Sequence, residues 1–319
     1  MATFTSNEVM EYRKLGETGL LVSLLGFGAS PLGDVYGPTD PAEIKRAVHF
    51  AIDRGINFFD VSPYYGIKLA EVRLGEALAG RRREILLATK CGRYGTAEFD
   101  FSAKGISASV EESLGRLRTD YVDLLQVHDV EFGDVRQIIE ETVPAMRRMQ
   151  EQGKARCVGI TGYSLKTLIQ IAEAVPVDTI LSYCRYNLLV GDMEHDLTPM
   201  AQKKRLGLIN ASGLHMGVLT EEGPPPWHPA PPEVLAAGRK AAKICRQHSQ
   251  DVAQVALRFC FDHSYVATTL VGMATQAHVE ANLNLLRIKT DTELVQKIRS
   301  AIAPALDYVW PSGRPENYG

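Results

Sequence analysis

The sequence has no long apolar segment and no excess of charge of either sign. None of its apolar stretches reaches the roughly 18 residues that a membrane-spanning helix needs. Its 35 Lys and Arg residues against 38 Asp and Glu residues give a formal net charge of −3, whereas nucleic-acid-binding proteins typically carry a basic excess or stripe. We therefore expect neither a membrane nor a nucleic acid as a partner.

Cysteine is also scarce, with five residues and no CxxC pair. An odd and unpaired set of this kind predicts reduced thiols rather than a disulfide framework or a zinc site, and we expect no metal. The N-terminal segment MATFTSNEVMEYRKLG lacks the basic and apolar regions of a signal peptide, and Glu8 and Glu11 argue against a transit peptide. We therefore expect a cytoplasmic protein.

What the sequence does contain is enough apolar side chain for a large core. Its 319 residues are 45% hydrophobic and 23% charged, values close to those of an average soluble globular protein. The length is about twice that of a typical domain, but a (β/α)8 barrel needs roughly 250 residues as one unit. Because no linker divides the chain, we expect residues 1–319 to form one domain, as a monomer or a homodimer.

Strand-like apolar runs alternate with helix-period segments along the whole chain. Near-continuous runs of Ile, Leu, Val and Phe are typical of parallel strands, which helices cover on both faces. The eight candidate strands are Leu24–Gly28, Ile56–Asp60, Ile85–Lys90, Tyr121–His128, Arg156–Thr161, Asp178–Ser182, Gly207–Ala211 and Val266–Gly272. Because a helical segment follows each strand and right-handed crossovers allow such a sheet to close, we predict an α/β fold of the (β/α)8 TIM-barrel type.

An open, doubly wound sheet is the alternative topology. It usually carries a GxGxxG motif after its first strand, and the corresponding segment GFGASP (26–31) lacks the third glycine. The first helix has clearer markers, because Asp40, Pro41 and Glu43 provide an N-cap, a first helical residue and an acidic first turn. Apolar residues then recur with helical spacing until Gly55.

Three segments lie outside the repeat. Residues 10–22 predict a short hairpin that closes the N-terminal end of the barrel. Residues 220–233 include GPPPWHPAPP, which is too rich in proline for a helix or strand, and a long loop of this kind is typical of a functional lid. The C-terminal segment DYVWPSGRPENYG predicts an irregular flap. We thus expect long loops at the C-terminal face of the barrel.

Polar, titratable residues follow three consecutive strands at the end where barrel enzymes hold their active site. Asp60 and Lys90 end two of the predicted strands, and His128 ends the next. Tyr64 and Tyr65 follow in the loop after Asp60. Each residue alone has an ordinary structural role, but burying all of them costs of the order of several kcal/mol unless they pair. We therefore predict a functional cluster.

These residues lie in segments that resemble the aldo-keto reductase family. The segments are GINFFDVSPYYG (55–66), LLATKCG (86–92), DYVDLLQVHD (120–129), GKARCVGITGYS (153–164) and VGMATQAHVEANLNLL (271–286). The family is a (β/α)8 barrel that binds a nicotinamide dinucleotide. The resemblance implies a catalytic tetrad of Asp60, Tyr65, Lys90 and His128. Tyr65 is preferred over Tyr64 because the family's tyrosine directly precedes glycine.

The tetrad predicts how Tyr65 transfers a proton. An unperturbed tyrosine titrates near ~10, so Tyr65 needs help from its neighbours. A Lys90 ammonium about 4 Å away is worth up to ~4 kcal/mol at an effective dielectric constant of ~20. We expect that interaction to lower the pKa of Tyr65 by roughly two or three units. Asp60 would then orient Lys90, and His128 would donate to the substrate oxygen.

The resemblance also implies a set of cofactor contacts. They are Gly28, Ala29, Ser30, Asp60, Thr161, Gly162, Ser182, Tyr183, Ser212, Leu214, Gly272, Met273, Gln276, His278 and Asn282. The chain departs from the family at the carboxamide, where a Ser-Asn pair is replaced by Thr161-Gly162. It also departs at the family's strand-six Gln, which falls at Ser182 or Tyr183, and at its ring-stacking aromatic, which falls near Ala211.

NAD is predicted as the cofactor, with NADP possible but less preferred. A protein that selects NADP normally provides Arg or Lys for the 2′-phosphate, and in the family this cation follows the last strand. Residues 272–278 contain neither Arg nor Lys. Arg287 is expected to lie too far along the following helix to help.

Within the family, the chain resembles dehydrogenases of L-galactose and L-fucose. The segments GASPLGD (28–34), KCGRY (90–94), PPPWHPAP (224–231) and VWPSG (309–313) carry this likeness. It implies that a small-molecule sugar is oxidised from its C1 hemiacetal to the aldonolactone. The expected sugar contacts are Tyr64, His128, Trp227, His228 and Trp310.

Other functions stay open. Bacterial relatives include pyridoxal dehydrogenases, and general aldehyde reductases belong to the same family. Outside the family, a Schiff-base lyase or aldolase would use Lys90 as its nucleophile. The barrel would alternatively be a non-catalytic nucleotide-binding module.

Overall fold

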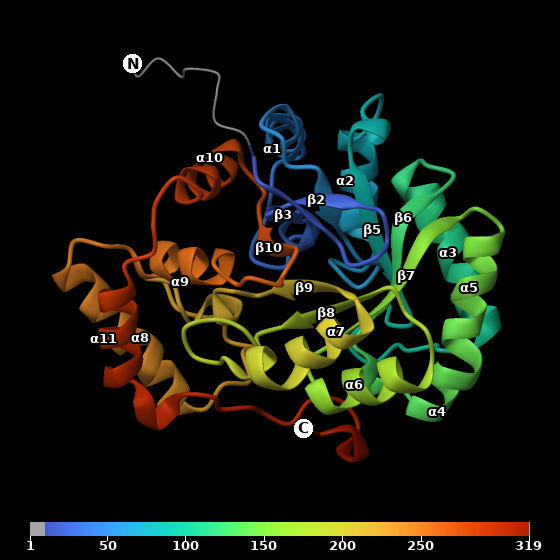
Figure 1. Ribbon diagram of the computed structural model, residues 1–319. Coiled ribbons are helices and arrows are strands. Elements are labelled where there is room, and N and C mark those ends of the chain that lie inside the picture. The colour runs from blue at the N-terminus through green and yellow to red at the C-terminus, as the bar shows by residue number, and fades with distance from the viewer. Residues whose placement is uncertain (1–9, 319) are drawn as a thin grey trace.

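Eight parallel strands close into a barrel in the computed structural model, which describes residues 10–318 (Figure 1). The strands are β3 (Leu25–Gly28), β4 (Phe58–Asp60), β5 (Leu86–Cys91), β6 (Val122–Val127), β7 (Ala155–Gly162), β8 (Thr179–Tyr183), β9 (Gly207–Ala211) and β10 (Thr268–Gly272). They follow one another around the barrel, and β10 pairs with β3 to close it. The predicted (β/α)8 fold is confirmed, with strand bounds within about two residues of those expected.

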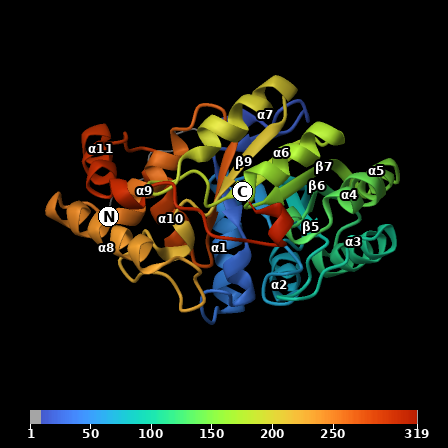
Figure 2. The same ribbon diagram turned by 90° about the horizontal axis from the view of Figure 1, so that it is seen from below.

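Helices cover the outside of this barrel. They are α1 (Pro41–Asp53), α2 (Leu69–Ala77), α3 (Ala103–Leu117), α4 (Val135–Gln137), α5 (Val143–Glu151), α6 (Leu165–Ala174), α7 (Thr198–Lys204), α8 (Pro232–Gln247), α9 (Val252–Phe261), α10 (Gln276–Leu285) and α11 (Thr292–Ala301). Figures 1 and 2 show α2, α3 and α5 beside one another on the side of β5, β6 and β7. None of the helices within residues 10–318 is long and apolar enough to cross a membrane.

The first helix begins as its sequence predicts. Asp40 Oδ1 accepts a hydrogen bond from Ala42 N at 3.0 Å, and Pro41 is the first helical residue. Ile44 and the other apolar residues at helical spacing are buried against the barrel. Gly55, which follows the helix, has a φ of +88°, a conformation that glycine adopts without steric strain. Local capping and periodicity therefore suffice to place this helix.

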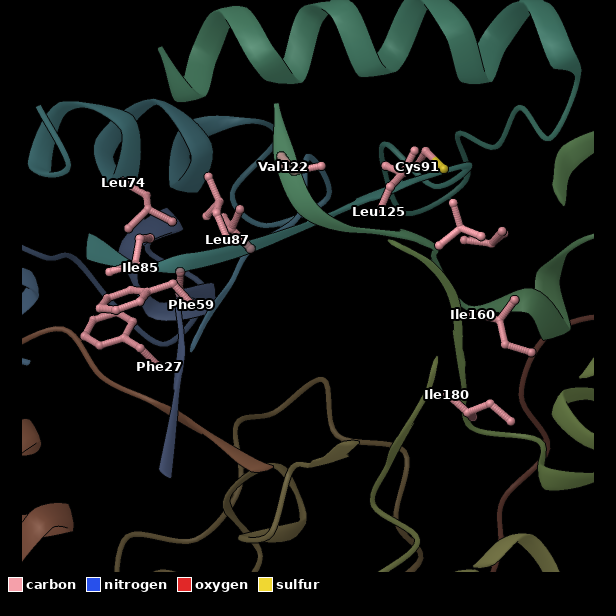
Figure 3. Close-up of a cluster of buried hydrophobic side chains, with 14 of the residues drawn as sticks. Phe27, Phe59, Leu74, Ile85, Leu87, Cys91, Val122, Leu125, Ile160 and Ile180 are labelled. Atoms are coloured by element: carbon pink, nitrogen blue, oxygen red, sulfur yellow. The ribbon is translucent and has the colours of Figure 1, made fainter. Parts of the chain in front are cut away.

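The main apolar core lies between the strands and the surrounding helices (Figure 3). The rings of Phe27 on β3 and Phe59 on β4 stack with their centroids 4.8 Å apart, and Leu74 of α2 lies near them. Leu87 on β5 continues the same layer. Phe58 instead joins the cluster inside the barrel, because successive side chains of a strand point to opposite faces.

A hairpin closes the N-terminal end of the barrel, and this prediction is also confirmed. β1 (Tyr12–Lys14) pairs antiparallel with β2 (Leu21–Ser23). Leu15 joins the apolar cluster inside the barrel. The turn approaches β9 so closely that a Cβ on Gly16 would lie 2.3 Å from Gly207 N. Only glycine fits at that contact.

Long irregular segments lie at the opposite, C-terminal end of the barrel. Residues 212–231 connect β9 to α8, and the C-terminal tail runs from α11 towards α6 (Figures 1 and 2). The tail is attached by hydrogen bonds of 3.1 Å from Trp310 N to Tyr163 Oη and from Thr167 Oγ1 to Asn317 O. All five cysteines are buried as free thiols, as their spacing predicts.

Candidate active site

The predicted catalytic residues lie at the C-terminal ends of three consecutive strands. Asp60 is the last residue of β4, Lys90 lies in β5, and His128 directly follows β6. Tyr65 belongs to the loop between β4 and α2. Because the carboxyl ends of parallel barrel strands meet at one end, the fold brings these four residues into one site.

A buried ion pair forms the floor of this site. Lys90 Nζ donates hydrogen bonds to Asp60 Oδ1 and, at 2.9 Å, to Val61 O. Gln126 Nε2 donates to the other Asp60 oxygen at 2.9 Å. The Lys90 and Asp60 side chains are 1% and 4% exposed. Charges buried to this extent need both a partner and further hydrogen bonds, and these contacts fix the ammonium in place.

Two adjacent tyrosines lie in the loop after β4, and the structure distinguishes them by the cation that each one faces. Lys90 Nζ lies 4.9 Å from the centroid of the Tyr65 ring, whereas the Arg93 guanidinium lies 4.0 Å from the Tyr64 ring. Both rings have their centroids 5.7 Å from that of His128. The contact with Lys90 therefore favours Tyr65 as the proton-transfer residue.

The pKa of Tyr65 is raised, whereas its sequence context predicts that it is lowered. Burial favours the uncharged phenol, and the nearby Asp60 carboxylate raises the pKa further. The Lys90 ammonium does not reverse these effects, because it is paired with Asp60 and lies over the tyrosine ring. The expected sign of the shift was wrong because it counted the lysine charge without its carboxylate partner.

The His128 ring is oriented by a hydrogen bond with Ser62. Ser62 Oγ accepts a hydrogen bond from Tyr64 N at 3.0 Å and lies 3.0 Å from His128 Nδ1. Burial, with the positive charges of Lys90 and Arg93, lowers the pKa of His128 well below its usual value, so the ring is neutral. We infer the tautomer in which the Ser62 hydroxyl donates to Nδ1 and the ring proton lies on Nε2, on the side of Asp129 Oδ2. We infer that Nε2 is the donor of this site.

Arg93 and Asp129 form a second buried ion pair that sequence reasoning did not single out. Arg93 Nη1 donates to Asp129 Oδ2, and the same oxygen lies 3.6 Å from His128 Nε2. Burial raises the pKa of Asp129, although Arg93 acts in the opposite direction. Each residue lies two positions beyond the end of its strand. The strand-end rule that singled out Asp60, Lys90 and His128 finds both when it is extended by two residues.

Glu131 is a third buried acid at this end of the barrel. Its Oε1 accepts hydrogen bonds from Tyr163 N and Tyr183 Oη, both at 3.1 Å. Burial and the neighbouring Asp129 charge raise the pKa of Glu131 to about 8. Its Oε2 has no hydrogen-bond partner in the described part of the chain and lies 2.7 Å from the position of a Cβ on Gly162. The missing side chain at Gly162 makes room for this carboxyl group.

The predicted cofactor residues lie mainly on the remaining arc of the same rim. The strand order places β7, β8, β9, β10 and β3 side by side. Along this arc lie Thr161 and Gly162 at the end of β7, Ser182 and Tyr183 at the end of β8, Ser212 after β9, Gly272 at the end of β10, Gly28 at the end of β3, and Ala29 and Ser30 after it. Asp60, on β4, borders the arc next to β3.

Two features of this arc fit a bound dinucleotide. Ser182 Oγ is buried and has no hydrogen-bond partner among residues 10–318, as expected where a ligand supplies the partner. α10 begins at Gln276 with Thr275 as its N-cap, whose Oγ1 accepts from His278 N at 3.1 Å. The first turn of a helix offers N–H groups to phosphate; here Gln276 N already donates to Glu43 Oε1 at 3.0 Å, and Asn282 lies further along the same helix.

Two predicted cofactor contacts pack into the protein interior instead. Met273 is fully buried in the main core. Leu214 is half-buried and packs against two apolar clusters. Both side chains pack in or against apolar clusters.

Three aromatic residues predicted to cover the substrate, Trp227, His228 and Trp310, form a chain of ring contacts. Trp310 is 7% exposed, and its ring stacks on Tyr163 with centroids 4.6 Å apart. His228 lies edge-on to Trp310 at 5.5 Å. Trp227 is 52% exposed and lies beside Tyr36, with ring centroids 6.2 Å apart. The Trp227 ring also stacks on His228, with centroids 6.4 Å apart, so Trp227 forms the exposed edge of the cluster that Trp310 buries.

Similarity to known proteins relates the chain to one family of enzymes. Residues 24–303 match the aldo/keto reductase family. The chain is 43% identical to L-galactose dehydrogenase from Arabidopsis thaliana over 97% of this chain and 99% of that protein. It is 30% identical to D-arabinose 1-dehydrogenase from Saccharomyces cerevisiae over 92% of this chain and 95% of that protein. The structure of an aldo-keto reductase from Bacillus halodurans, solved in its holo form, matches this chain with a TM-score of 0.77 and 27% sequence identity. The match covers 96% of this chain and 100% of that chain.

Proposed function

This chain belongs to the aldo-keto reductase family, and we propose that it oxidises the C1 hemiacetal of an L-aldose, such as L-galactose or L-fucose, to the aldonolactone with NAD. The observation that carries the proposal is the meeting of Tyr65 and His128 above the Lys90–Asp60 ion pair. The similarity to L-galactose dehydrogenase from Arabidopsis thaliana supports the choice of sugar.

Tyr65 accepts the proton, and His128 binds the reacting oxygen. In oxidation, the proton of the C1 hydroxyl passes to Tyr65 Oη, and His128 Nε2–H donates a hydrogen bond to the same substrate oxygen. Lys90, held by Asp60, lies over the Tyr65 ring and stabilises negative charge on the phenol. A bound nicotinamide supplies the acceptor for the hydride that leaves C1. The arc from β7 to β3 provides the residues that would hold it.

The start of α10 favours NAD over NADP. Glu43 of α1 accepts a hydrogen bond from Gln276 N at 3.0 Å, so a carboxylate already lies on the first turn of this helix. That hydrogen bond and the contact with Arg46 lower the pKa of Glu43, so Glu43 is charged at neutral pH. The Glu43 carboxylate repels a 2′-phosphate placed here. The nearby Arg46 already donates a hydrogen bond to Glu43 at 2.8 Å.

A Schiff-base lyase or aldolase is less well supported. Its nucleophile would be Lys90, which must offer an unprotonated amine to a carbonyl carbon. The Lys90 nitrogen instead donates to Asp60 and to Val61 O at the floor of the site. These contacts suit a lysine that positions and stabilises its neighbours.

One panel of substrates tests the proposal. Purified protein with NAD or NADP is offered L- and D-aldoses and pyridoxal, and turnover is followed at the nicotinamide absorbance. We expect L-galactose and L-fucose to be oxidised, because they differ only at C6. D-Galactose should react poorly, because misplaced ring hydroxyls leave buried partners unpaired.

The other outcomes each favour a different function. Oxidation of pyridoxal but of no aldose would assign the chain to the pyridoxal dehydrogenases. Reduction of simple aldehydes alone would indicate a general aldehyde reductase. Borohydride trapping of substrate on Lys90 without nicotinamide would indicate a Schiff-base enzyme. Nucleotide binding without turnover of any substrate would indicate a binding module.

A further inference from the structure

A buried ion pair lies beside the reacting position but takes no part in the proposed proton transfer. Asp129 directly follows His128, and its Oδ2 lies 3.6 Å from His128 Nε2. Arg93, whose side chain is 11% exposed, donates to that same Oδ2. A carboxylate and a guanidinium thus stand next to the nitrogen that donates to the reacting oxygen.

We propose that Arg93 and Asp129 bind the hydroxyl group on the carbon next to the reacting one, which is the C2 hydroxyl of a pyranose. This inference rests on the proposed function. A hydroxyl group both donates and accepts hydrogen bonds. Asp129 therefore accepts a hydrogen bond from this hydroxyl, and Arg93 donates one to its oxygen. Neighbouring sugar hydroxyls are roughly one hydrogen-bond length apart. An O1 atom bound at His128 Nε2 therefore places O2 within reach of Asp129.

The surrounding residues hold Arg93 rigidly for such a role. Its guanidinium lies 4.0 Å from the ring centroid of Tyr64 and 4.5 Å from that of Phe132. Arg93 Nε is buried and has no hydrogen-bond partner in the described part of the chain. The guanidinium is therefore fixed by aromatic rings while the protein leaves part of its donor capacity unused. Rigid donors of this kind lose little conformational entropy when a ligand binds.

The backbone at Asp129 forms a left-handed turn that is anchored to the next strand. Its φ is +52°, in the left-handed region that, among non-glycine residues, Asn and Asp adopt most readily. Asp129 N donates to Thr161 Oγ1 at 3.0 Å, which anchors the turn to β7. A buried ion pair adds little net stability compared with apolar residues of equal volume. Substrate recognition explains why this turn carries a buried charged residue at this place.

The test measures discrimination at C2 within each variant. We compare kcat/KM for L-fucose and 2-deoxy-L-fucose in the wild-type protein and in Asp129→Asn, with the better of NAD and NADP. The wild-type protein should prefer L-fucose by roughly 100-fold or more, because loss of the hydroxyl leaves buried partners unpaired. In Asp129→Asn that preference should fall below about tenfold. The ratio for L-galactose against L-fucose, which differ at C6, should stay unchanged.

Two further variants control for folding and for a merely structural effect. Arg93→Lys keeps the charge but removes the planar fork, so we expect a smaller loss of C2 preference, and this variant decides the matter if Asp129→Asn fails to fold. Asp178→Asn is the control for a lost ion pair. It breaks the pair between Asp178 Oδ1 and Arg147 Nη2, which lie 3.0 Å apart at the opposite end of the barrel. It should leave both ratios unchanged. Thermal melting of each variant verifies the fold.

Unchanged C2 preference in both Asp129→Asn and Arg93→Lys would overturn this inference alone. A loss of C6 discrimination with C2 preference intact would overturn it as well, because the pair would then contact the other end of the sugar. Failure of the wild-type protein to oxidise any aldose would instead overturn the proposed function, and this inference with it. The two failures are therefore distinguishable by the wild-type measurement.

Discussion

At the scale of single residues, two neighbouring tyrosines face different cations. Tyr65→Phe removes the hydroxyl that we propose exchanges the proton and keeps the ring that lies against Lys90. We expect kcat to fall by roughly two to four orders of magnitude, with little change in melting temperature. Tyr64→Phe is the matched control, because its ring packs on Arg93 and its hydroxyl transfers no proton. Equal losses in the two variants would contradict the assignment.

The raised pKa of Tyr65 determines how the rate depends on pH. Burial and Asp60 favour the neutral phenol, so the phenolate fraction grows with pH up to and beyond the usual value of ~10. Oxidation needs the phenolate, and its kcat/KM should rise from pH 7 to pH 10 without a plateau, whereas reduction needs the phenol and should stay level. Initial rates in both directions measure this. A plateau in oxidation near pH 8 would mean that a bound ligand lowers the pKa after all.

Glu131 links pH to stability. The pKa of Glu131 is about 8 in the folded protein, against ~4.3 for an unfolded chain. Between these values the folded state binds more protons than the unfolded state, so this group lowers stability as pH rises. Glu131→Gln removes the titration, and its melting temperature relative to wild type should increase from pH 5 to pH 8 and then level off. A difference that is constant over this range would refute the shift.

At the scale of elements, two glycines in neighbouring helices have opposite roles. A Cβ on Gly75 of α2 would lie 2.3 Å from Arg116 O of α3, so Gly75→Ala forces the helices apart and should destabilise the protein by roughly 1–3 kcal/mol. Gly115 of α3 is exposed, with nothing within 4 Å of an added Cβ. Gly115→Ala should stabilise by roughly 0.5–1 kcal/mol. Denaturant unfolding measures both, and destabilisation by Gly115→Ala would count against the packing described.

At the scale of the whole molecule, α1 and α10 meet from opposite ends of the chain, and Glu43 lies at the helix start where a 2′-phosphate of NADP would be placed. We expect kcat/KM to favour NAD by at least about tenfold, or about 1.4 kcal/mol. Glu43→Gln should shift the ratio towards NADP by removing one negative charge, measured at low salt. Glu84→Gln is the control, because its carboxylate pairs with Arg81 before β5. An NADP preference in the wild-type protein would show that another segment supplies the cation.

The sequence by itself determined the barrel, the hairpin and the positions of the tetrad. Strand runs, helical spacing and a cap such as Asp40 are local patterns, and each acts within a few residues of itself. Closure of the sheet then follows from eight repeats with one handedness. Asp60, Lys90 and His128 could be placed together because each ends a strand, and parallel strand ends share one rim.

Only the tertiary structure decided the electrostatics and the specific partners. Tyr65 faces Lys90, and its pKa is raised because that lysine is already paired and the ring is buried. Glu43 meets Gln276 across 233 positions of the chain, and Asp129 acquires a partner 36 positions away. Burial and distances between remote residues set both the sign and the size of such interactions. These quantities exist only once the chain has packed, so no local pattern contains them.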